Sequence, residues 1–172
     1  MKIAVTGTHR AGKTTLAEKL QASLNGYFYQ QEPYFELEEK GYIFSETPGF
    51  DDFYAQLTYS VKQLLVKEPN IIFDRCPLDF LAYIQAVSGP EAAQQLYPEI
   101  QYAMESIDLL VFVPVENPDL ISCSEHDFPE LREGVNELLH AWVTDLDMAV
   151  IQVTGTVAER EDQVIRGILN AK

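Results

Sequence analysis

The segment Gly7-Thr8-His9-Arg10-Ala11-Gly12-Lys13-Thr14 constrains this chain more than any other. It matches the pattern G-x-x-x-x-G-K-[ST] at every position, and it stands between an apolar run at residues 2–6 and a helical pattern at residues 13–24. The glycines let the backbone turn its N–H groups inward, where they and the helix N-terminus form a nest for an anion. The sequence therefore predicts a phosphate-binding loop, the P-loop, between a buried strand and a helix.

Each residue type in this loop suits the binding of a nucleoside triphosphate. Lys13 is expected to reach the β- and γ-phosphates, Thr14 to hold Mg²⁺ through its hydroxyl, and Thr15 to contact the α-phosphate. Arg10 either leans towards the phosphates or stays solvated. The remaining nucleotide-binding positions are Gly7, Thr8, His9, Ala11 and Gly12. A glycine-rich turn with an incidental lysine is the alternative, and the strand before and helix after the motif disfavour it.

Apolar runs of strand length alternate with helical patterns along the rest of the chain. The expected strands are residues 2–6, 27–31, 70–74, 108–115 and 149–154, and the expected helices are residues 13–24, 34–40, 51–67, 77–88, 91–105, 130–147 and 156–170. Continuous apolar strands that alternate with helices predict a parallel sheet covered by helices on both faces. In such a fold, ligands bind beyond the carboxyl ends of the strands.

Composition and charge limit the classes of partner. The chain has 172 residues, of which 47% are hydrophobic, which suffices for one domain with a full core over residues 1–172. The net charge of −15 argues against nucleic acid as a main partner. The apolar runs are too short to cross a bilayer, and Cys76 and Cys123 form neither a metal-binding spacing nor a disulfide framework. We expect a cytoplasmic protein; its oligomeric state is not indicated.

Asp74 and Arg75 stand at the end of the strand expected at residues 70–74. A P-loop needs an acidic partner for Mg²⁺, usually at the end of a neighbouring strand, and Asp74 fits that position. Asp74 or Cys76 could instead cap the helix that Pro77 opens. Arg75 could grip the acceptor or the transferred phosphoryl group, or it could pair with a nearby carboxylate.

Three segments of the chain resemble a known superfamily. GTHRAGKTTL followed by FDRCPLDFLAY is similar to the P-loop kinase superfamily, and the second segment resembles the DR-x-x-x-D-x-x-x-Y pattern of a bacterial AAA-type ATP-binding domain family related to nicotinamide riboside kinases. It also resembles the acidic-Arg-Ser motif of deoxynucleoside kinases, with Cys76 in place of the serine. The tail VTGTVAEREDQV resembles the segment that lies against adenine in those proteins. The resemblance implies the three-layer P-loop nucleoside triphosphate hydrolase fold with a five-stranded sheet, and ATP with Mg²⁺.

The resemblance also implies roles for two further residues. The pair Glu32-Pro33 stands where deoxynucleoside kinases carry the carboxylate that accepts the proton of the attacking hydroxyl. A carboxylate near Arg75 could orient a hydroxyl for in-line attack, whereas the alternative is a solvated loop glutamate. Arg160, in the tail, would lie near the adenine, or would form a surface ion pair with Glu159 or Asp162.

Aromatic residues offer candidates for an acceptor pocket. The helix expected at residues 51–67 would form one wall, where Phe53 or Tyr54 could stack on a planar ring and Gln56 could bond its edge. The alternative places Phe53 in the core and Tyr54 on the surface. Tyr34 and Tyr83 allow the same two interpretations.

Residues 116–133 are expected to form a lid, because small-molecule kinases close a mobile segment over the triphosphate and bring in arginines. Arg132 is the only arginine of this segment. We expect it to neutralise charge in the transition state; a helix-surface ion pair is the alternative. Between Cys76 and Leu131 the chain has ten Asp or Glu residues and no Lys or Arg.

These features predict a Mg-ATP-dependent phosphotransferase acting on a small hydroxylated acceptor, above all a nucleoside or nucleoside-like compound. The expected catalytic residues are Lys13, Glu32, Asp74, Arg75 and Arg132, and the expected metal ligands are Thr14 and Asp74. A nucleoside monophosphate kinase is one alternative, although it needs cations for the phosphate of its acceptor. A regulatory ATPase without a small-molecule acceptor is the other. The sequence has no convincing N-K-x-D segment, which favours ATP over GTP.

Overall fold

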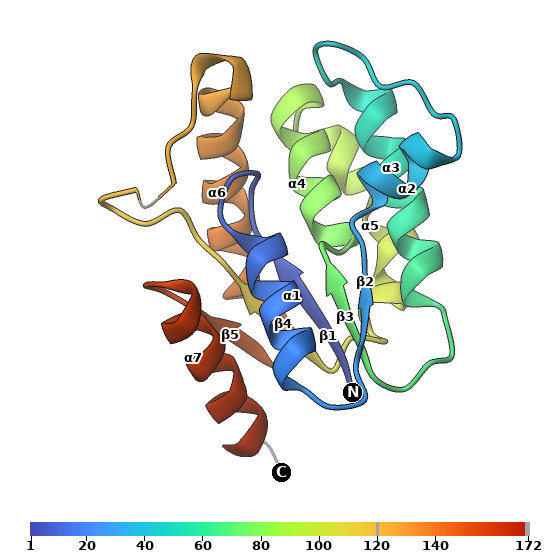
Figure 1. Cartoon of the computed structure of the whole chain (residues 1–172). Helices are drawn as coiled ribbons and strands as arrows, with labels where there is room; N and C mark the ends of the chain where they lie inside the picture. The colour runs from blue at the N-terminus through green and yellow to red at the C-terminus, as the bar shows by residue number, and fades with distance from the viewer. Residues whose placement is uncertain (120, 171–172) are drawn as a thin grey trace.

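The computed structural model describes residues 1–119 and 121–170 (Figure 1). The strands are β1 (Lys2–Thr6), β2 (Phe28–Gln30), β3 (Ile71–Asp74), β4 (Leu109–Phe112) and β5 (Val150–Gln152). The helices are α1 (Lys13–Ser23), α2 (Pro33–Glu39), α3 (Phe50–Leu64), α4 (Pro77–Ser88), α5 (Pro90–Met104), the 3-10 turn η1 (Glu125–Asp127), α6 (Pro129–Val143) and α7 (Val157–Asn170). Every strand and α-helix expected from the sequence is present, with ends that differ by up to four residues.

The five strands form one parallel sheet in the order β2-β3-β1-β4-β5, which confirms the predicted fold class. β1 lies between β3 and β4. After β1 the chain first forms β2 and β3 on one side of it and then β4 and β5 on the other, and this change of direction opens a crevice at the carboxyl end of β1. The register places Asp74 beside Val5 and Phe112 beside Thr6. The ends of β3 and β4 therefore flank the P-loop that follows β1.

Alternate side chains of the central strands enter two separate cores. Ile3 and Val5 belong to the core beneath α1 and α7, which lie side by side in Figure 1. Ala4, Phe73 and Phe112 belong to the other core, which α3, α4, α5 and α6 cover. The strands are buried on both faces for this reason, and their sequences are continuously apolar rather than alternating.

Helix α4 is the most deeply placed helix on its side of the sheet. It packs against α3, α5 and α6, and its residues 77–84 are all buried. Its N-terminus begins directly after β3, next to the P-loop. A side chain near the start of α4 is therefore held rigidly by packing at the edge of the predicted site. Among residues 1–119 and 121–170, no helix has the length and hydrophobicity needed to span a bilayer.

Substitutions in α3 test this packing. Leu57 is fully buried against α4 and the sheet, whereas Leu65, at the end of the same helix, is 49% exposed. We expect Leu57→Ala to lower the free energy of unfolding by about 2–5 kcal/mol, because it loses apolar burial and leaves a cavity. Leu65→Ala should change it by less than about 0.5 kcal/mol. Urea denaturation measures both values, and equal effects would contradict the position of α3.

Candidate nucleotide-binding and acceptor site

The backbone of the P-loop demands glycine at both ends. Gly7 has φ 149°, and a Cβ atom added there would lie 2.4 Å from the carbonyl oxygen of Val113. Gly12 has φ 87°, and a Cβ atom there would lie 3.1 Å from Nη1 of Arg160. Side chains at these positions would be strained, and at Gly7 two backbones would collide. The two motif glycines thus allow β1, the loop and α1 to follow each other this closely.

Two buried arginines hold the outer side of the P-loop. Arg132 donates through Nε to the carbonyl oxygen of His9 (3.1 Å) and through Nη2 to that of Arg10 (3.0 Å). Arg160 donates through Nη1 to the carbonyl oxygen of Ala11 (2.7 Å). In a trans peptide the C=O and the following N–H point in opposite directions. These three contacts therefore turn three successive N–H groups to the inner side, where an anion would bind.

Carboxylates of the 116–133 segment neutralise both arginines. Asp119 accepts from Arg132 at 2.6 and 3.1 Å, and Glu116 accepts from Arg160 at 3.0 Å. The two arginines are only 6% and 4% exposed, so the surface ion pairs considered from the sequence do not form. Arg160 pairs with neither Glu159 nor Asp162. The predicted contacts of Arg132 with the transferring group and of Arg160 with adenine stay predictions.

Lys13 lies buried beneath the loop. Its Nζ donates to the carbonyl oxygen of Thr8 at 2.6 Å. Burial, with the positive charge of Arg75, lowers the pKa of Lys13 to about 8, although Asp74, Asp79 and Glu32 oppose the shift. A polyphosphate would add negative charge beside the ammonium and favour its protonated form. The predicted contact of Lys13 with phosphate stays a prediction.

Asp74, at the end of β3, has one carboxylate oxygen without a hydrogen-bond partner. Its Oδ2 accepts from the hydroxyl of Tyr29 (3.1 Å), while Oδ1 is buried without a hydrogen-bond partner. Burial raises the pKa of Asp74, against the opposing effects of Lys13 and the Thr14 hydroxyl. Asp74 does not cap α4, because Cys76 is the N-cap and its N–H donates to Asp79. The metal-binding interpretation therefore keeps its support.

The free oxygen of Asp74 fits a role towards Mg²⁺. This ion takes oxygen ligands, and proteins hold it with one or two carboxylates together with phosphate oxygens and water. Residues 1–119 and 121–170 contain no group of three or more His, Cys, Asp or Glu side chains arranged to hold a metal. An ion here would accordingly depend on the nucleotide for most of its ligands, with Asp74 and Thr14 as the protein's contribution.

Arg75 and Glu32 come together at the edge of the P-loop. Nε of Arg75 donates to Oε2 of Glu32 (2.6 Å), and its Nη1 donates to the carbonyl oxygen of Gly7 (3.3 Å). Burial alone would raise the pKa of Glu32, but Arg75 and Lys13 hold it below its usual range. Glu32 is thus an ionised, oriented carboxylate rather than a solvated loop residue. Arg75 adopts the ion pair that the sequence left open, and it has φ 77°, an uncommon conformation for a non-glycine residue.

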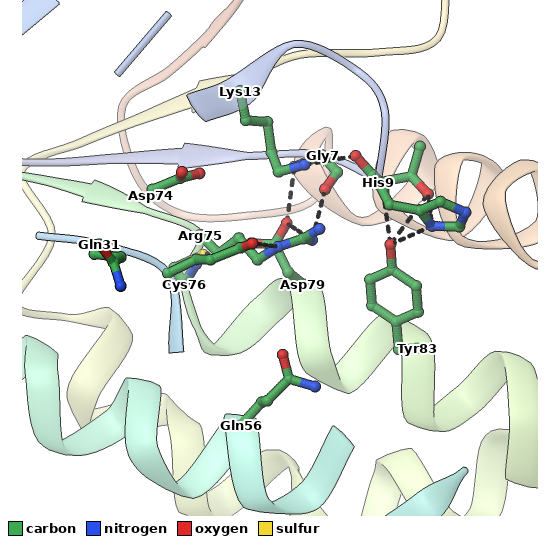
Figure 2. Close-up of polar contacts among 12 residues, drawn as sticks. Gly7, His9, Lys13, Gln31, Gln56, Asp74, Arg75, Cys76, Asp79 and Tyr83 are labelled. Atoms are coloured by element: carbon green, nitrogen blue, oxygen red, sulfur yellow. Dashed lines mark hydrogen bonds and ion pairs between the residues drawn. The ribbon is translucent and has the colours of Figure 1, made fainter. Parts of the chain in front are cut away.

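Two residues of α4 that the sequence analysis gave no such role complete this arrangement (Figure 2). Asp79 is fully buried and accepts from the N–H of Gly7 (2.8 Å) and from that of Cys76 (2.9 Å). It therefore joins the start of the P-loop to the start of α4. Tyr83 points its hydroxyl at His9 and accepts from the N–H of that residue (2.7 Å). The sequence signal for both residues was the DR-x-x-x-D-x-x-x-Y pattern, in which Asp79 is the second aspartate and Tyr83 the tyrosine. Asp79 also stands three residues after an N-cap, where a carboxylate bonds the cap backbone.

A pocket of about 340 Å³ opens beside Glu32 and Arg75. Its lining also includes His9, Tyr34, Phe44, Ser45, Glu46, Pro48, Phe53, Gln56, Phe80, Tyr83, His126, Asp127, Phe128 and Leu131. A larger cavity of about 500 Å³ between α4, α5 and α6 includes no P-loop residue, so the smaller pocket is the candidate acceptor site.

The aromatic candidates divide between this pocket and the surface. Phe53 is buried, lines the pocket and stacks on Tyr83 with ring centroids 4.7 Å apart, so it belongs to both core and wall. Gln56 is buried beside it and uses one N–H group on the carbonyl oxygen of Asp52 (3.2 Å). Tyr54 is 36% exposed and does not line the pocket, which agrees with the alternative that placed it on the surface.

The predicted lid segment lies against the P-loop. Asp127, in η1, pairs with Arg10 at 2.7 Å, and its carbonyl oxygen lies 2.5 Å from Nε2 of His9. The Arg10 side chain is half exposed, and its pair with Asp127 holds it instead of leaving it free to turn towards the phosphate-binding side of the loop. Position 120 of this segment lies outside the described residues. Movement of the segment stays a prediction.

Several solved structures share this fold. Deoxyadenosine kinase from M. mycoides, with dCMP and dCDP bound, superposes with a TM-score of 0.72 and 21% identity over 100% of both chains. NadR in complex with NR gives a TM-score of 0.70 and 21% identity over 98% of this chain and 48% of the other. Thymidylate kinase from Ehrlichia chaffeensis gives 0.68 and 15% over 98% of each.

A family model described as an AAA domain matches residues 2–160, so the chain belongs to that family. None of the curated proteins compared with the chain matches it significantly. The resemblance carried by the P-loop, the DR segment and the tail is thereby confirmed for the family and the fold. The roles of individual site residues stay predictions.

Paired glycine substitutions test the tight turn of the P-loop. Gly7→Ala should lower the free energy of unfolding by about 2 kcal/mol or more, because the new methyl group would force two backbones apart. Gly134, in α6, has open space around its Cβ position. Gly134→Ala should therefore raise the free energy of unfolding by up to about 1 kcal/mol through helix propensity. Thermal unfolding of the two variants measures both effects. An unchanged stability of Gly7→Ala would contradict the close approach of Gly7 to the Val113 backbone.

The pH dependence of stability tests the burial of His9. Burial, together with the charges of Arg75, Lys13 and Arg132, lowers the pKa of His9 to about 4, although its bond to the Asp127 carbonyl opposes the shift. The unfolded chain takes up this proton near pH 6.5, before the folded chain does, so stability is lost as the pH falls from 6.5 to 4. The loss from His9 should be about 2–3 kcal/mol.

The variant His9→Gln, which cannot titrate, isolates this contribution. Carboxylates titrate in the same range in both proteins, so only the difference between their slopes reports on His9. We expect a shallower loss of stability in the variant, measured by urea unfolding at several pH values. Parallel curves would show that His9 is not a buried neutral imidazole.

Proposed function

We propose that this protein is a Mg-ATP-dependent phosphotransferase whose acceptor is a small hydroxylated compound, above all a nucleoside or nucleoside-like molecule. The observation that carries the proposal is the Glu32 carboxylate, held by Arg75 at 2.6 Å between the P-loop and the pocket. The similar solved structures support it, since they are those of a deoxyadenosine kinase, a thymidylate kinase and a protein in complex with NR. Those substrates belong to the relatives.

In this proposal the P-loop and β3 bind the nucleotide. Lys13 contacts the β- and γ-phosphates of ATP, and the inward N–H groups of residues 10–12 surround them. Thr14 and Asp74 are the residues that would hold Mg²⁺, which supplies charge neutralisation on the phosphates when it is bound. The adenine would lie towards Arg160 and the tail.

The acceptor hydroxyl would meet the γ-phosphoryl group next to Glu32. Its oxygen forms a bond to the γ-phosphorus, the bond from that phosphorus to the bridging oxygen breaks, and ADP leaves. The proton of the hydroxyl passes to Glu32, which is ionised in this structure. Phe53 would pack on a planar ring of the acceptor, and the carbonyl group of Gln56 would accept from its edge. Positioning and electrostatics account for the catalysis.

Charge in the pocket favours an acceptor that carries no phosphate. The pocket contains the carboxylates of Glu32, Glu46 and Asp127, whereas its one permanent cation is Arg75. Arg75 is already paired with Glu32 and lies 3.7 Å from Asp79. Among the described residues that line the pocket, no cation is left for the phosphate of a nucleoside monophosphate. A nucleoside fits the pocket better for this reason.

One observation favours the regulatory ATPase as a second candidate. Arg10, Arg132 and Arg160 are each paired with a carboxylate of the 116–133 segment. Arginines that are engaged in this way do not contribute charge to phosphoryl transfer unless the segment moves. A protein that binds ATP and turns it over slowly would show the same pairs.

A coupled assay of ADP release with a panel of nucleosides and nucleoside monophosphates separates the candidates. We expect Glu32→Gln to lower acceptor-dependent turnover by about 10²–10⁴-fold, because the proton acceptor is lost, with little change in Mg-ATP affinity. Glu39, exposed at the end of α2, the helix that begins directly after Glu32, provides the matched control Glu39→Gln, which should have unchanged turnover.

Two other outcomes would reject the nucleoside proposal. Slow hydrolysis that is independent of acceptor and unaffected by Glu32→Gln identifies the regulatory ATPase. Turnover confined to acceptors that already carry a phosphate identifies a monophosphate kinase.

A further inference from the structure

Tyr83 begins a chain of hydrogen bonds that the proposed transfer does not use. Its hydroxyl oxygen lies 2.7 Å from the backbone nitrogen of His9 and 2.7 Å from Nδ1 of the same residue (Figure 2). The other ring nitrogen, Nε2, lies 2.5 Å from the carbonyl oxygen of Asp127. The chain runs from α4 through the P-loop to η1, and so joins three segments that are far apart in the sequence.

The direction of every hydrogen bond in this chain follows from two constraints. A carbonyl oxygen can only accept, so Nε2 of His9 must carry the hydrogen that Asp127 receives. The imidazole stays neutral because its ring is buried and because the cations Arg75, Lys13 and Arg132 disfavour its protonation. A neutral imidazole carries one hydrogen, which is on Nε2, so Nδ1 has none and must accept. The Tyr83 hydroxyl therefore donates to Nδ1 at 2.7 Å rather than to the Thr8 hydroxyl oxygen at 3.4 Å, and its oxygen accepts the backbone N–H of His9.

The Tyr83 side chain is fixed by contacts that do not involve η1. It is 4% exposed, its ring stacks on Phe53 with an interplanar angle of 18°, and the Arg75 guanidinium lies 5.6 Å from the ring centroid. It belongs to the buried part of α4. The hydroxyl is therefore in place before η1 arrives, and it can impose a hydrogen-bond pattern on His9.

The η1 turn depends strongly on the His9 contact. Its other described bond to the P-loop is the Arg10–Asp127 pair, whose arginine side chain is 50% exposed. Exposed pairs of this kind contribute little, about 0–1 kcal/mol. His126, Asp127 and Phe128 line the acceptor pocket, so the bond from Nε2 to Asp127 holds one wall of that pocket.

We infer that the Tyr83 hydroxyl is a positioning group that keeps the His9 hydrogen on Nε2, and that this hydrogen holds η1 over the acceptor pocket. Without the hydroxyl, a neutral imidazole could also carry its hydrogen on Nδ1. It would then face the Asp127 carbonyl with a lone pair, and the two acceptors would repel each other. The inference rests on the proposed function only where it takes the pocket to hold an acceptor.

The variant Tyr83→Phe tests this role because it removes the hydroxyl and keeps the stacked ring. At neutral pH, ¹⁵N spectra of the imidazole should show the Nε2–H tautomer of His9 in the wild type and a mixture of tautomers in the variant. Amide hydrogen exchange of residues 121–128 should become about tenfold faster in the variant, the effect of losing one hydrogen bond. Exchange in β1 and β3 should stay unchanged, which a general loss of stability would not produce.

Two further variants keep the test decisive. Tyr54→Phe removes a hydroxyl from an exposed tyrosine and should change neither the spectrum nor the exchange. His9→Phe removes both ring nitrogens, and it should accelerate exchange of residues 121–128 at least as much as Tyr83→Phe does. The double variant should show no additional acceleration, because both residues act through the same bond.

The outcomes separate this inference from the proposed function. In a turnover assay, Tyr83→Phe should raise the acceptor KM by about tenfold and leave the KM for Mg-ATP within about twofold. Failure of the wild type to use any acceptor would reject the proposed function, while the spectra and exchange would still decide the role of Tyr83. The Nδ1–H tautomer in the wild type, or unchanged exchange at residues 121–128 in Tyr83→Phe, would overturn the inference.

Discussion

The site depends on the contacts between two guanidinium groups and the carbonyl oxygens of the P-loop. Arg132 and Arg160 bind the loop from outside, and each is neutralised by a carboxylate close to the end of β4. Without these contacts, three peptide groups would have no reason to point their N–H groups inward in the absence of a ligand. The loop is thereby organised before a nucleotide binds, which lowers the free-energy cost of ordering it on binding.

The fold and the core of the site could be predicted from the sequence because their signals are local. The order of apolar runs defines the strands, and G-x-x-x-x-G-K-T defines the turn after β1, since glycine at both of its ends is a steric requirement. Asp74 and Arg75 follow a strand directly, so a parallel sheet brings them to the P-loop whatever the rest of the chain does. The position of Glu32 near Arg75 needed more than local pattern, and it came from the family resemblance; an ion pair with an unnamed carboxylate was the alternative interpretation of Arg75.

The contacts that were not foreseen join residues distant in sequence. The sequence suggested surface ion pairs for Arg160 because carboxylates stand beside it, yet its partner Glu116 is 44 residues away. Asp79 binds the N–H of Gly7 across 72 residues, and Tyr83 reaches His9 across 74. Such pairings depend on the strand order and on the burial of α4, and no periodicity in the sequence contains either. The DR-x-x-x-D-x-x-x-Y pattern marks Asp79 and Tyr83 through the family resemblance, but it does not say which P-loop groups they bond.

The carboxylates opposite Arg132 and Arg160 have a consequence for how this chain tolerates change. Glu116 and Asp119 lie in a connecting segment, where substitutions are ordinarily accepted. Here each side chain supports an arginine that shapes the phosphate nest, so replacing either one would leave a buried guanidinium without its counter-charge. Laboratory evolution or loop exchange aimed at the surface between β4 and η1 would therefore alter the shape of the P-loop through its outer side, away from the inward N–H groups.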